Sequence, residues 1–480
     1  MPAIRPVEGL ELDGFVFEKR LHQGGMGSLW RARNAVTGEP LVIKIPFLGD
    51  GEDASTIVGF EVEQMIMPRL TGPHVPRFAG LGDFNRLPYI AMELIDGTPL
   101  PDRQSGTWPI DTIVSTGIKV AKALQDLHRQ HVIHLDLKPA NLMRRAHGDI
   151  VFIDFGLSRH LQLPDLLAEE SDVPMGSAPY MAPEQVLGRR TDPRSDVFAV
   201  GVILYEWLTG KYPFGNPKGQ GGLRQRLWSD PVPPRTLRPD CPPWLQEVIL
   251  RCLSVDPERR YPSAAQLCFA LQHPDQIKLT ELAEKTERDG LGTRVARFFK
   301  SRTADLPSPV EKPLVDTAPI VMIAVDLAQG VDELAATLRM QAGLILTTQP
   351  DARIAFVTVL KTALLSVEND DLRDGHNAYV QRLIELKDWA RPLVSRDEVV
   401  SYHVLEAVDA AAALIDYARH NTVDHIVLGA RGSSTVRRYL GVCHRKLSRK
   451  HPAQSRWFDS SKGLKMKLPE FAHHSSICAA

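Results

Sequence analysis

The stretch His134-Leu-Asp-Leu-Lys-Pro-Ala-Asn141, followed by Asp154-Phe-Gly156, decides how this chain of 480 residues is interpreted. It places two acids, a lysine and an asparagine at the spacing that a metal-dependent phosphoryl transfer requires. Such a transfer needs a carboxylate to orient a hydroxyl nucleophile, ligands for magnesium, and a cation for the migrating phosphoryl charge. The candidates for these roles are Asp136, Asn141, Asp154 and Lys138. Either motif alone arises by chance in a long chain, but the two in this order are a specific signal.

A glycine-rich hairpin is predicted upstream, in Leu21-His-Gln-Gly-Gly-Met-Gly-Ser-Leu-Trp30. Its glycines let backbone amides approach phosphate oxygens without an intervening side chain. They are Gly24, Gly25 and Gly27. The next apolar run, Leu41-Val-Ile-Lys-Ile45, is typical of a buried strand, and it carries one lysine. Burying Lys44 is costly unless a carboxylate and phosphate oxygens pair with it, so we predict that they do; an edge-strand lysine that reaches solvent is the alternative.

The carboxylate partner of this lysine is expected in the helix predicted around residues 56–70. That helix offers Glu61 and Glu63. Glu63 lies three residues after Phe60 and seven before Leu70, on a face flanked by apolar side chains. We therefore predict Glu63 as the partner, with Glu61 as a solvated helix charge.

An apolar strand, Tyr89-Ile-Ala-Met-Glu-Leu-Ile95, ends at the turn Asp96-Gly97. A strand that leads into an extended link between two lobes can offer backbone N–H and C=O groups to the edge of an adenine. The sequence therefore predicts a nucleotide-binding link here. Its residues are Met92 at the entrance, then Glu93, Leu94 and Ile95.

Residues 14–272 resemble a protein kinase of the Ser/Thr type found in bacteria. The resemblance covers the whole length of a kinase domain. Besides the motifs above, it rests on Ala182-Pro-Glu184, Ser195-Asp196-Val-Phe-Ala-Val-Gly201 and Asp256-Pro-Glu-Arg-Arg260. It implies an α+β bilobal kinase fold, with an N-lobe at 14–93 and a C-lobe at 94–272. It also implies ATP and Mg²⁺ as cofactors, and transfer of the γ-phosphoryl group to Ser/Thr hydroxyls of proteins.

The resemblance assigns a role to each candidate residue. The catalytic residues are Asp136, Lys138, Lys44 and Glu63, and the metal ligands are Asn141 and Asp154. The nucleotide-binding residues are Gly24, Gly25, Gly27, Lys44, Met92, Glu93, Ile95, Asn141 and Asp154. The position of Lys138, two residues after Asp136, resembles Ser/Thr kinases rather than tyrosine kinases.

Three further roles follow from the same resemblance. Asp196 is expected to support the backbone of the catalytic loop, and Arg260 to pair with Glu184. Gly176-Ser-Ala-Pro-Tyr-Met181 resembles the end of the activation segment that docks the substrate, with Ser177 where the family usually has threonine.

Two positions depart from the family pattern. His22 stands in place of the first glycine of the loop, where it could crowd the nucleotide. Leu135 stands where many kinases carry an arginine that gathers charge around a phosphorylated activation loop. Switching by phosphorylation is therefore in doubt, and Ser158 and Ser171 are interpreted as solvated loop serines rather than phosphosites. A pseudokinase, which binds ATP as a scaffold without transfer, is the alternative function.

The second half of the chain alternates strands with helices after a charged linker at 273–315. The alternation predicts an α/β doubly wound parallel sheet at 316–441, and residues 318–441 resemble the universal stress protein family. That resemblance implies a second nucleotide held by Asp326, Gly429 and Gly432, although Val442 stands where the family has a hydroxyl residue. A sensor or regulatory domain is expected; a nucleotide, a homodimer partner and a redox state are all compatible signals.

The tail at 442–480 lacks the helix and buried strand with which such a domain should end. It is rich in basic residues, His and Ser, and shows no strand pattern. One interpretation is a disordered tail. The other is a shift of the coding frame near Gly441–Val442, because reading from the third base of the Val442 codon can give LSSQIVAEAPCTVTVV. That sequence reads as a helix, a proline break and a strand. The shifted tail would leave a sheet edge exposed.

Composition excludes several other classes of protein. The formal net charge is −1, so no global field favours nucleic acid. No apolar run approaches the roughly 18 to 20 residues of a membrane span, and the N-terminus has no apolar signal core. Five cysteines without a Cys-x-x-Cys pair favour free thiols. The expected location is therefore cytoplasmic.

Overall fold

The computed structural model describes residues 5–24, 27–47, 54–102, 106–170, 173–287, 320–327, 332–348, 352–361, 378–394, 400–421, 423–428, 454–457 and 476–479. The chain divides into two compact units, each with its own six-stranded sheet. The first unit holds Met1–Phe47 and Val58–Pro307, and the second holds Leu48–Ile57 and Ser308–Ala480.

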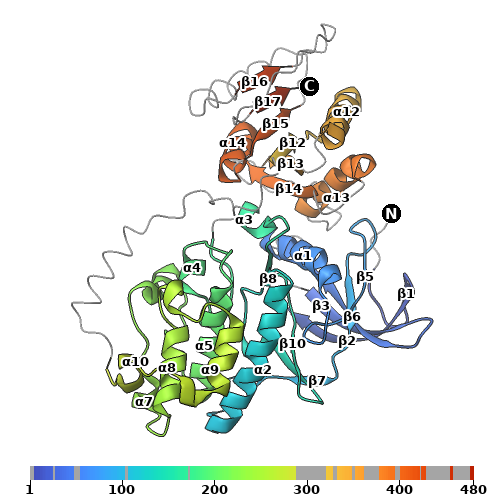
Figure 1. The fold of residues 1–480 in the computed structure, drawn as a ribbon. Coiled ribbons are helices and arrows are strands. Elements are labelled where there is room, and N and C mark those ends of the chain that lie inside the picture. The colour runs from blue at the N-terminus through green and yellow to red at the C-terminus, as the bar shows by residue number, and fades with distance from the viewer. Residues whose placement is uncertain are drawn as a thin grey trace. The chain divides into compact units, whose positions relative to one another are not determined.

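The first unit begins with an antiparallel sheet in the strand order β1-β2-β3-β4-β6-β5 (Figure 1). Its strands are β1 (Glu11–Leu12), β2 (Phe15–Gly24), β3 (Gly27–Asn34), β4 (Pro40–Pro46), β5 (Phe78–Leu81) and β6 (Ile90–Glu93). Helix α1 (Ala54–Ile66) follows β4 in the chain. In β4 the apolar residues Leu41, Ile43 and Ile45 alternate with less buried ones, because a period of two turns one face of a strand to the core.

The rest of the first unit is mainly helical (Figure 1). Its long helices are α2 (Ile110–Arg129), α5 (Arg194–Thr209), α8 (Pro243–Cys252) and α9 (Ala264–Gln272). Every residue of α5 from Ser195 to Leu208 is buried. A Cβ at Gly201 would collide with Cys252, so glycine is required for α8 to approach α5. A sheet part followed by a helical part makes the bilobal α+β fold that the sequence predicts.

Short elements complete the first unit. The strands are β7 (Gly97–Pro99), β8 (Val132–Ile133), β9 (Leu142–Arg145), β10 (Ile150–Phe152) and β11 (Arg159–His160). The α-helical turns are α3 (Leu166–Glu170), α4 (Pro183–Val186), α6 (Gln220–Leu223), α7 (Pro234–Leu237) and α10 (Glu281–Glu284). The 3₁₀ turns are η1 (Met67–Arg69), η3 (Pro139–Asn141), η4 (Arg224–Leu227), η5 (Pro257–Arg259) and η6 (Pro274–Gln276).

The second unit is a parallel sheet in the order β14-β13-β12-β15-β17-β16. The strands of its main part are β12 (Ile320–Ala324), β13 (Arg353–Lys361), β14 (Val400–Ala407) and β15 (His425–Leu428). The helices are α12 (Asp332–Thr348), α13 (Ala378–Ala390) and α14 (Ala410–His420), with the 3₁₀ turn η7 (Arg391–Leu393). The order of the strands reverses between β12 and β15, which are neighbours in the sheet.

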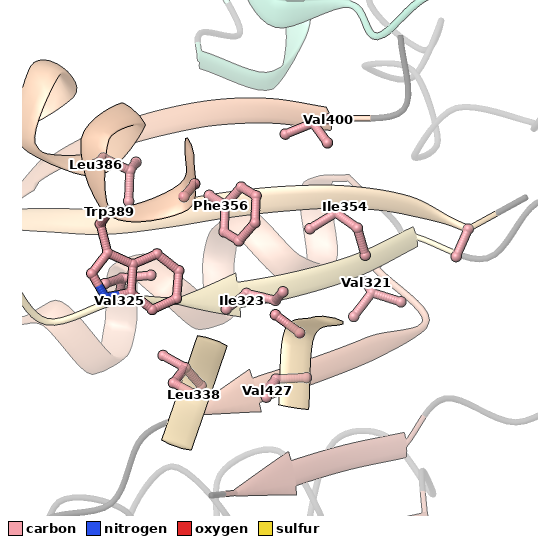
Figure 2. Packing of buried hydrophobic residues seen from close by; sticks show 13 residues of the cluster. Val321, Ile323, Val325, Leu338, Ile354, Phe356, Leu386, Trp389, Val400 and Val427 are labelled. Carbon is pink, nitrogen blue, oxygen red and sulfur yellow. The ribbon is translucent and has the colours of Figure 1, made fainter. Parts of the chain in front are cut away.

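Helices cover both faces of this sheet. On one face Ile323 and Phe356 pack with Trp389 of α13, and the two aromatic rings meet edge to face at 5.8 Å (Figure 2). On the other face Met322 packs with Tyr417 of α14. Successive residues of a strand point to opposite faces, so an unbroken apolar strand such as β12 needs cover on both sides. The doubly wound α/β fold predicted from the sequence is therefore confirmed.

Two strands of the tail extend the sheet beyond β15. They are β16 (Gln454–Trp457) and β17 (Ser476–Ala479), and β17 pairs with β15 in parallel. The sequence shows no strand pattern after Gly441, so the structure differs from that expectation in these two segments. The exposed edge that a frame shift implies is covered at β15 by β17. The backbone groups of an edge strand can pair with an extended chain whatever its side-chain pattern. The other residues of 442–480 lie outside the described part of the chain.

The first unit continues past residue 272, where the sequence predicts a linker. Ala283 of α10 is buried, and Nε2 of Gln246 in α8 donates to the carbonyls of Leu282 (2.8 Å) and Ala283 (3.1 Å). The structure thus differs from the linker prediction at 273–287, where buried Ala283 and the bonds from Gln246 dock a polar stretch on the first unit. Among the described residues, no helix combines the length and apolar character that crossing a membrane requires.

Candidate active site

Asp196, in the first turn of α5, holds the backbone of the motif that begins at His134. Its carboxylate accepts hydrogen bonds from the backbone N–H groups of His134 (2.8 Å) and Leu135 (2.9 Å), and Nε2 of His128 lies 2.9 Å away. Leu135 has a φ of 62°, a backbone conformation that persists only where the surroundings impose it. Asp196 thus fixes the loop that carries Asp136, as the resemblance implies.

Asp136 lies at the centre of a polar network. Its Oδ2 accepts from Nζ of Lys138 (2.8 Å) and from Nδ2 of Asn141 (3.1 Å), and its Oδ1 accepts from the backbone N–H of Ser177 (2.7 Å). Nζ of Lys138 also donates to Oγ of Ser177 at 2.9 Å. Because three groups hold it, the carboxylate keeps one orientation, which a group that positions a hydroxyl needs.

Lys44 of β4 joins two carboxylates. Its Nζ lies 2.6 Å from Oε2 of Glu63 in α1 and 2.8 Å from Oδ1 of Asp154. Burial alone lowers the pKa of Lys44, but the charges of Glu63 and Asp154 outweigh it, so the pKa lies above its usual value and the ammonium stays charged. The charge of Lys44 in turn lowers the pKa of Asp154. The structure thus brings Glu63 to Lys44 and adds Asp154 as a second partner.

Asn141 and Asp154 provide oxygen donors for a metal. Both side-chain bonds of Asn141 to Asp136 use Nδ2, which leaves the amide oxygen for a cation. Asp154 is ionised beside Lys44, and its side chain is 40% exposed. A carboxylate and an amide oxygen, completed by phosphate oxygens and water, match the way Mg²⁺ binds in proteins. The residues present therefore fit the predicted cation.

The glycine-rich hairpin joins β2 to β3, with Gly24 opposite Gly27. A Cβ at Gly27 would collide with the backbone carbonyl of Ile45, so only glycine fits there. His22 is exposed, and its Nε2 would lie 3.1 Å from a Cβ added at Gly24. The imidazole therefore lies against this glycine. Gly25 lies outside the described residues.

The predicted nucleotide link is fixed by a side chain. Met92 and Glu93 end β6, and Ile95 follows and is buried. The carboxylate of Glu93 accepts from Nη2 of Arg145 in β9 (3.0 Å) and from the backbone N–H of Arg77 (3.1 Å). Burial favours a higher pKa for Glu93, but the bonds from Arg145 outweigh it and lower the pKa, so the ion pair persists. The link is thereby tied at Glu93 to β9 and to the backbone of Arg77, by contacts that the sequence does not predict.

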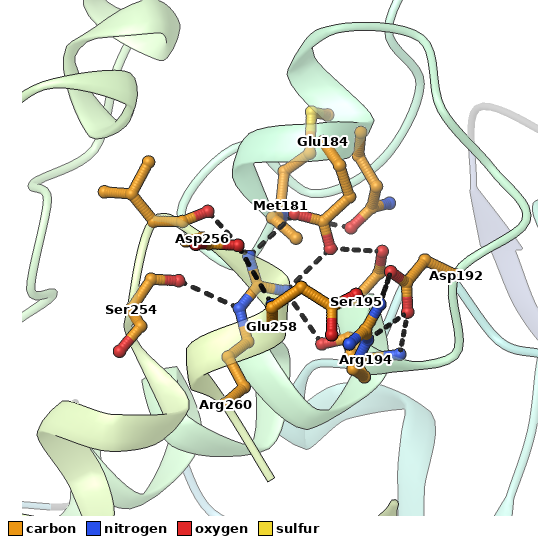
Figure 3. Close-up of polar contacts among 12 residues, drawn as sticks. Met181, Glu184, Asp192, Arg194, Ser195, Ser254, Asp256, Glu258 and Arg260 are labelled. Carbon is orange, nitrogen blue, oxygen red and sulfur yellow. Dashed lines mark hydrogen bonds and ion pairs between the residues drawn. The ribbon is translucent and has the colours of Figure 1, made fainter. Parts of the chain in front are cut away.

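A buried ion pair anchors the end of the segment that runs from Asp154 to Glu184. Nη1 and Nη2 of Arg260 lie 2.7 Å from Oε1 and Oε2 of Glu184, and Oγ of Ser195 donates to Oε1 at 2.6 Å (Figure 3). Arg260 is 1% exposed and Glu184 5% exposed. Two parallel charge-assisted hydrogen bonds fix both distance and angle. They hold α4 to Arg260, the pair that the resemblance implies, and the bond from Ser195 holds α4 to α5.

A second buried arginine supports residues 176–181, which we call the docking segment. Arg226 of η4 donates to the carbonyls of Ala178 (2.6 Å), Leu223 (3.0 Å) and Met181. Burial lowers the pKa of Arg226 to about 10, so it remains charged at neutral pH. Nothing in the sequence distinguishes Arg226 from a surface arginine, and its role is missed there.

Ser158 is not the solvated serine that the sequence predicts. It is 2% exposed, and its Oγ donates to the carbonyl of His134 at 3.1 Å. Ser158 follows a turn at residues 156–157 that brings the chain back to the loop carrying Asp136. That loop buries the hydroxyl of Ser158. Ser171 lies outside the described residues.

A bilobal fold with these residues gathered around one lysine and two aspartates defines a protein of the kinase class. The chain belongs to the protein kinase family: the model of the protein kinase domain matches residues 15–274, more than half of the chain. The model of the universal stress protein family matches residues 319–444. Both resemblances stated from the sequence are confirmed.

Several curated relatives are bacterial. The chain is 32% identical over 299 residues to the serine/threonine-protein kinase PknB of Mycolicibacterium smegmatis, covering 60% of this chain and 47% of that protein. It is 35% identical over 271 residues to the serine/threonine-protein kinase pkn3 of Myxococcus xanthus, covering 54% and 49%. The chain thus spans about half the length of these relatives. The crystal structure of the Mycobacterium tuberculosis PknI kinase domain superimposes with a TM-score of 0.44 at 22% identity, covering 56% of this chain and 100% of that one.

Proposed function

We propose that this protein transfers the γ-phosphoryl group of ATP to serine and threonine hydroxyls of proteins, with Mg²⁺ as its metal. The network around Asp136 carries the proposal, because Lys138, Asn141 and Ser177 fix its carboxylate at 2.7–3.1 Å. ATP with its metal supplies the phosphoryl group and spreads the developing charge. What remains for the protein is positioning and electrostatics, which are the properties of this network.

Each residue has one task in this mechanism. Asp136 orients the substrate hydroxyl and accepts its proton, and Lys138 balances charge beside the transferred group. Lys44 binds phosphate oxygens and is held in place by Glu63. Asn141 and Asp154 hold the metal. Gly24, Gly25, Gly27, Met92, Glu93 and Ile95 surround the nucleotide in this proposal.

The test is phosphoryl transfer by the full chain. The protein is incubated with Mg²⁺, γ-labelled ATP and a generic basic protein, and label is sought on serine and threonine. Binding of a non-hydrolysable ATP analogue is measured in parallel. We expect both binding and label. Binding without label would establish the alternative, an ATP-binding scaffold, which His22 and Leu135 suggest in the sequence. If neither binding nor label is found, the nucleotide site itself is refuted.

For the second unit we propose a regulatory domain with its own nucleotide. Asp326 follows β12 and is exposed, and β15, which leads to Gly429 and Gly432, is the neighbour of β12. The strand order reverses between these two strands, and doubly wound sheets bind ligands beyond the carboxyl ends of strands at such a reversal. Gly429 and Gly432 lie outside the described residues. Equilibrium binding should give two ATP analogues per chain, and a stoichiometry of one would contradict this proposal; a homodimer partner is the alternative signal.

The location we propose is the cytoplasm. Cys241 and Cys252 are free and buried, and burial raises the pKa of the Cys241 thiol to about 11. Such thiols are inert core groups of a kind that suits a reducing compartment.

We also propose that residues 442–480 are read in a shifted coding frame. The universal stress protein model matches up to residue 444, close to the predicted shift near Gly441–Val442. The pairing of β17 with β15 involves backbone groups, so it does not depend on a native side-chain pattern. Resequencing the gene should reveal one inserted or deleted base near this codon. Close relatives with the same tail would refute the shift.

A further inference from the structure

The activation segment, which runs from Asp154 to Glu184, contains a carboxylate that two arginines contact. One arginine lies within the segment and the other lies beyond its end. Nε of Arg190 lies 3.0 Å from Oδ2 and 3.2 Å from Oδ1 of Asp165, and Nε of Arg159 lies 3.5 Å from Oδ2. The side chains of Arg190, Arg159 and Asp165 are 11%, 13% and 14% exposed. Charge pairs that are shielded from water to this extent are stronger than the same pairs at an open surface.

This cluster closes the activation segment into a loop. Arg159 lies in β11, near the start of the segment, and Asp165 immediately precedes α3. Arg190 lies beyond α4, on the far side of the docking segment. The contacts between Asp165 and Arg190 therefore join the two ends of the stretch that presents the protein substrate.

Arg190 also connects the cluster to the catalytic loop. Its Nη2 donates to the carbonyl of Leu157 at 3.0 Å. The next residue, Ser158, donates its Oγ to the carbonyl of His134 at 3.1 Å. A path of direct contacts thus runs from Asp165 to the loop that carries Asp136.

We propose that Asp165 is a positioning residue for phosphoryl transfer, supplying permanently the negative charge that a phosphorylated residue supplies in other kinases. Leu135 stands where many kinases carry the arginine that gathers such a phosphate, and its side chain is buried and uncharged. Arg159 and Arg190 provide the cations instead, and Asp165 provides their anion. The activation segment is therefore held without phosphorylation. This inference rests on the proposed function, because it concerns the efficiency of the same transfer.

The variant Asp165→Asn tests the charge alone. Oδ1 of Asp165 also accepts from the backbone N–H of Ala168 at the start of α3 (3.4 Å), and asparagine caps a helix start as well as aspartate does. We expect kcat/KM for the protein substrate to fall roughly tenfold, the size of a lost charge-assisted contact. KM for ATP should stay unchanged, since the cluster lies at neither Lys44 nor the glycine-rich hairpin. Asp165→Glu should recover most of the rate.

A double-mutant cycle separates this role from two independent defects. Arg190→Gln should cost at least as much as Asp165→Asn, because it also removes the bond to the carbonyl of Leu157. The double variant should be no worse than Arg190→Gln alone, because the ion pair with Asp165 is already lost there. Asp230→Asn is the matched control: Asp230 pairs with Lys285 at 3.0 Å, its side chain is 21% exposed, and it has no part in the site. Its kinetics should equal those of the wild type. Phosphatase treatment should leave the wild-type initial rate intact.

Four results would overturn the inference: an Asp165→Asn rate within twofold of the wild type, losses that multiply in the double variant, an equal rise in KM for ATP, or a many-fold loss of wild-type rate after phosphatase. In each case the wild type still transfers phosphate before treatment. Absence of wild-type transfer is a different outcome, which refutes the proposed function itself.

Discussion

Replacing Asp136 with asparagine should nearly abolish phosphoryl transfer while ATP still binds. Asparagine keeps the size of the side chain and one oxygen, which can still accept from the backbone N–H of Ser177. Its amide nitrogen would face two donors, Nζ of Lys138 and Nδ2 of Asn141, and it accepts no proton. The loss of kcat should be about 10²–10⁴-fold, the usual contribution of a positioned base. Labelled transfer and equilibrium binding of an ATP analogue measure the two effects separately.

Asp154→Asn provides the contrast. Asp154 is both a proposed metal ligand and a partner of Lys44 at 2.8 Å, so its loss should weaken binding of the metal–nucleotide complex as well as transfer. The two variants should therefore differ in affinity for ATP. Wild-type turnover by Asp136→Asn would show that the site has been assigned to the wrong residues.

Glu184→Gln should lower the stability of the first unit strongly. It removes the charge that compensates Arg260, a guanidinium that is 1% exposed and bound at two points. Breaking a buried ion pair from one side leaves an uncompensated charge, which costs about 3–5 kcal/mol. Hydrogen exchange measured on peptides from α5 and α8 of the full chain should show the loss, because these helices lie next to the pair in the first unit.

The matched control is Glu258→Gln, in the same view (Figure 3). Glu258 accepts from Nη2 of Arg194 at 2.7 Å, but its side chain is 77% exposed. Water replaces an exposed partner at little cost, so exchange in α5 and α8 should hardly change. If hydrogen exchange in α5 and α8 rises equally in the two variants, burial is not what makes the Glu184–Arg260 pair important for stability.

The sequence predicts the parts of the site that depend on short spacing. Asp136, Lys138 and Asn141 lie within one loop, and the buried lysine in β4 requires a partner, so their grouping follows from chemistry. The contacts that it misses join distant loops, as in Glu93 with Arg145, 52 positions apart. Such pairs arise only when packing brings two surfaces together, and no periodicity records them.

The same reason explains the errors in the fold. The strand β17 pairs through its backbone, which leaves no pattern in the side chains. Residues 273–287 are polar, and α10 is docked by buried Ala283 together with hydrogen bonds from Gln246 of α8. The apolar runs of β12 and β13 identify them as strands, because each buries most of its side chains.

Arg226 makes the docking segment a joint product of two stretches of chain, 45 to 48 positions apart. A segment grafted from a relative would bring new side chains. Its backbone carbonyls would still need the guanidinium of Arg226 in the same position to donate to them. Conversely, a relative that lacks the arginine must shape the same loop by other means. The substrate docking proposed for residues 176–181 therefore depends on residues beyond them, and the smallest unit to transplant extends from the docking segment through η4.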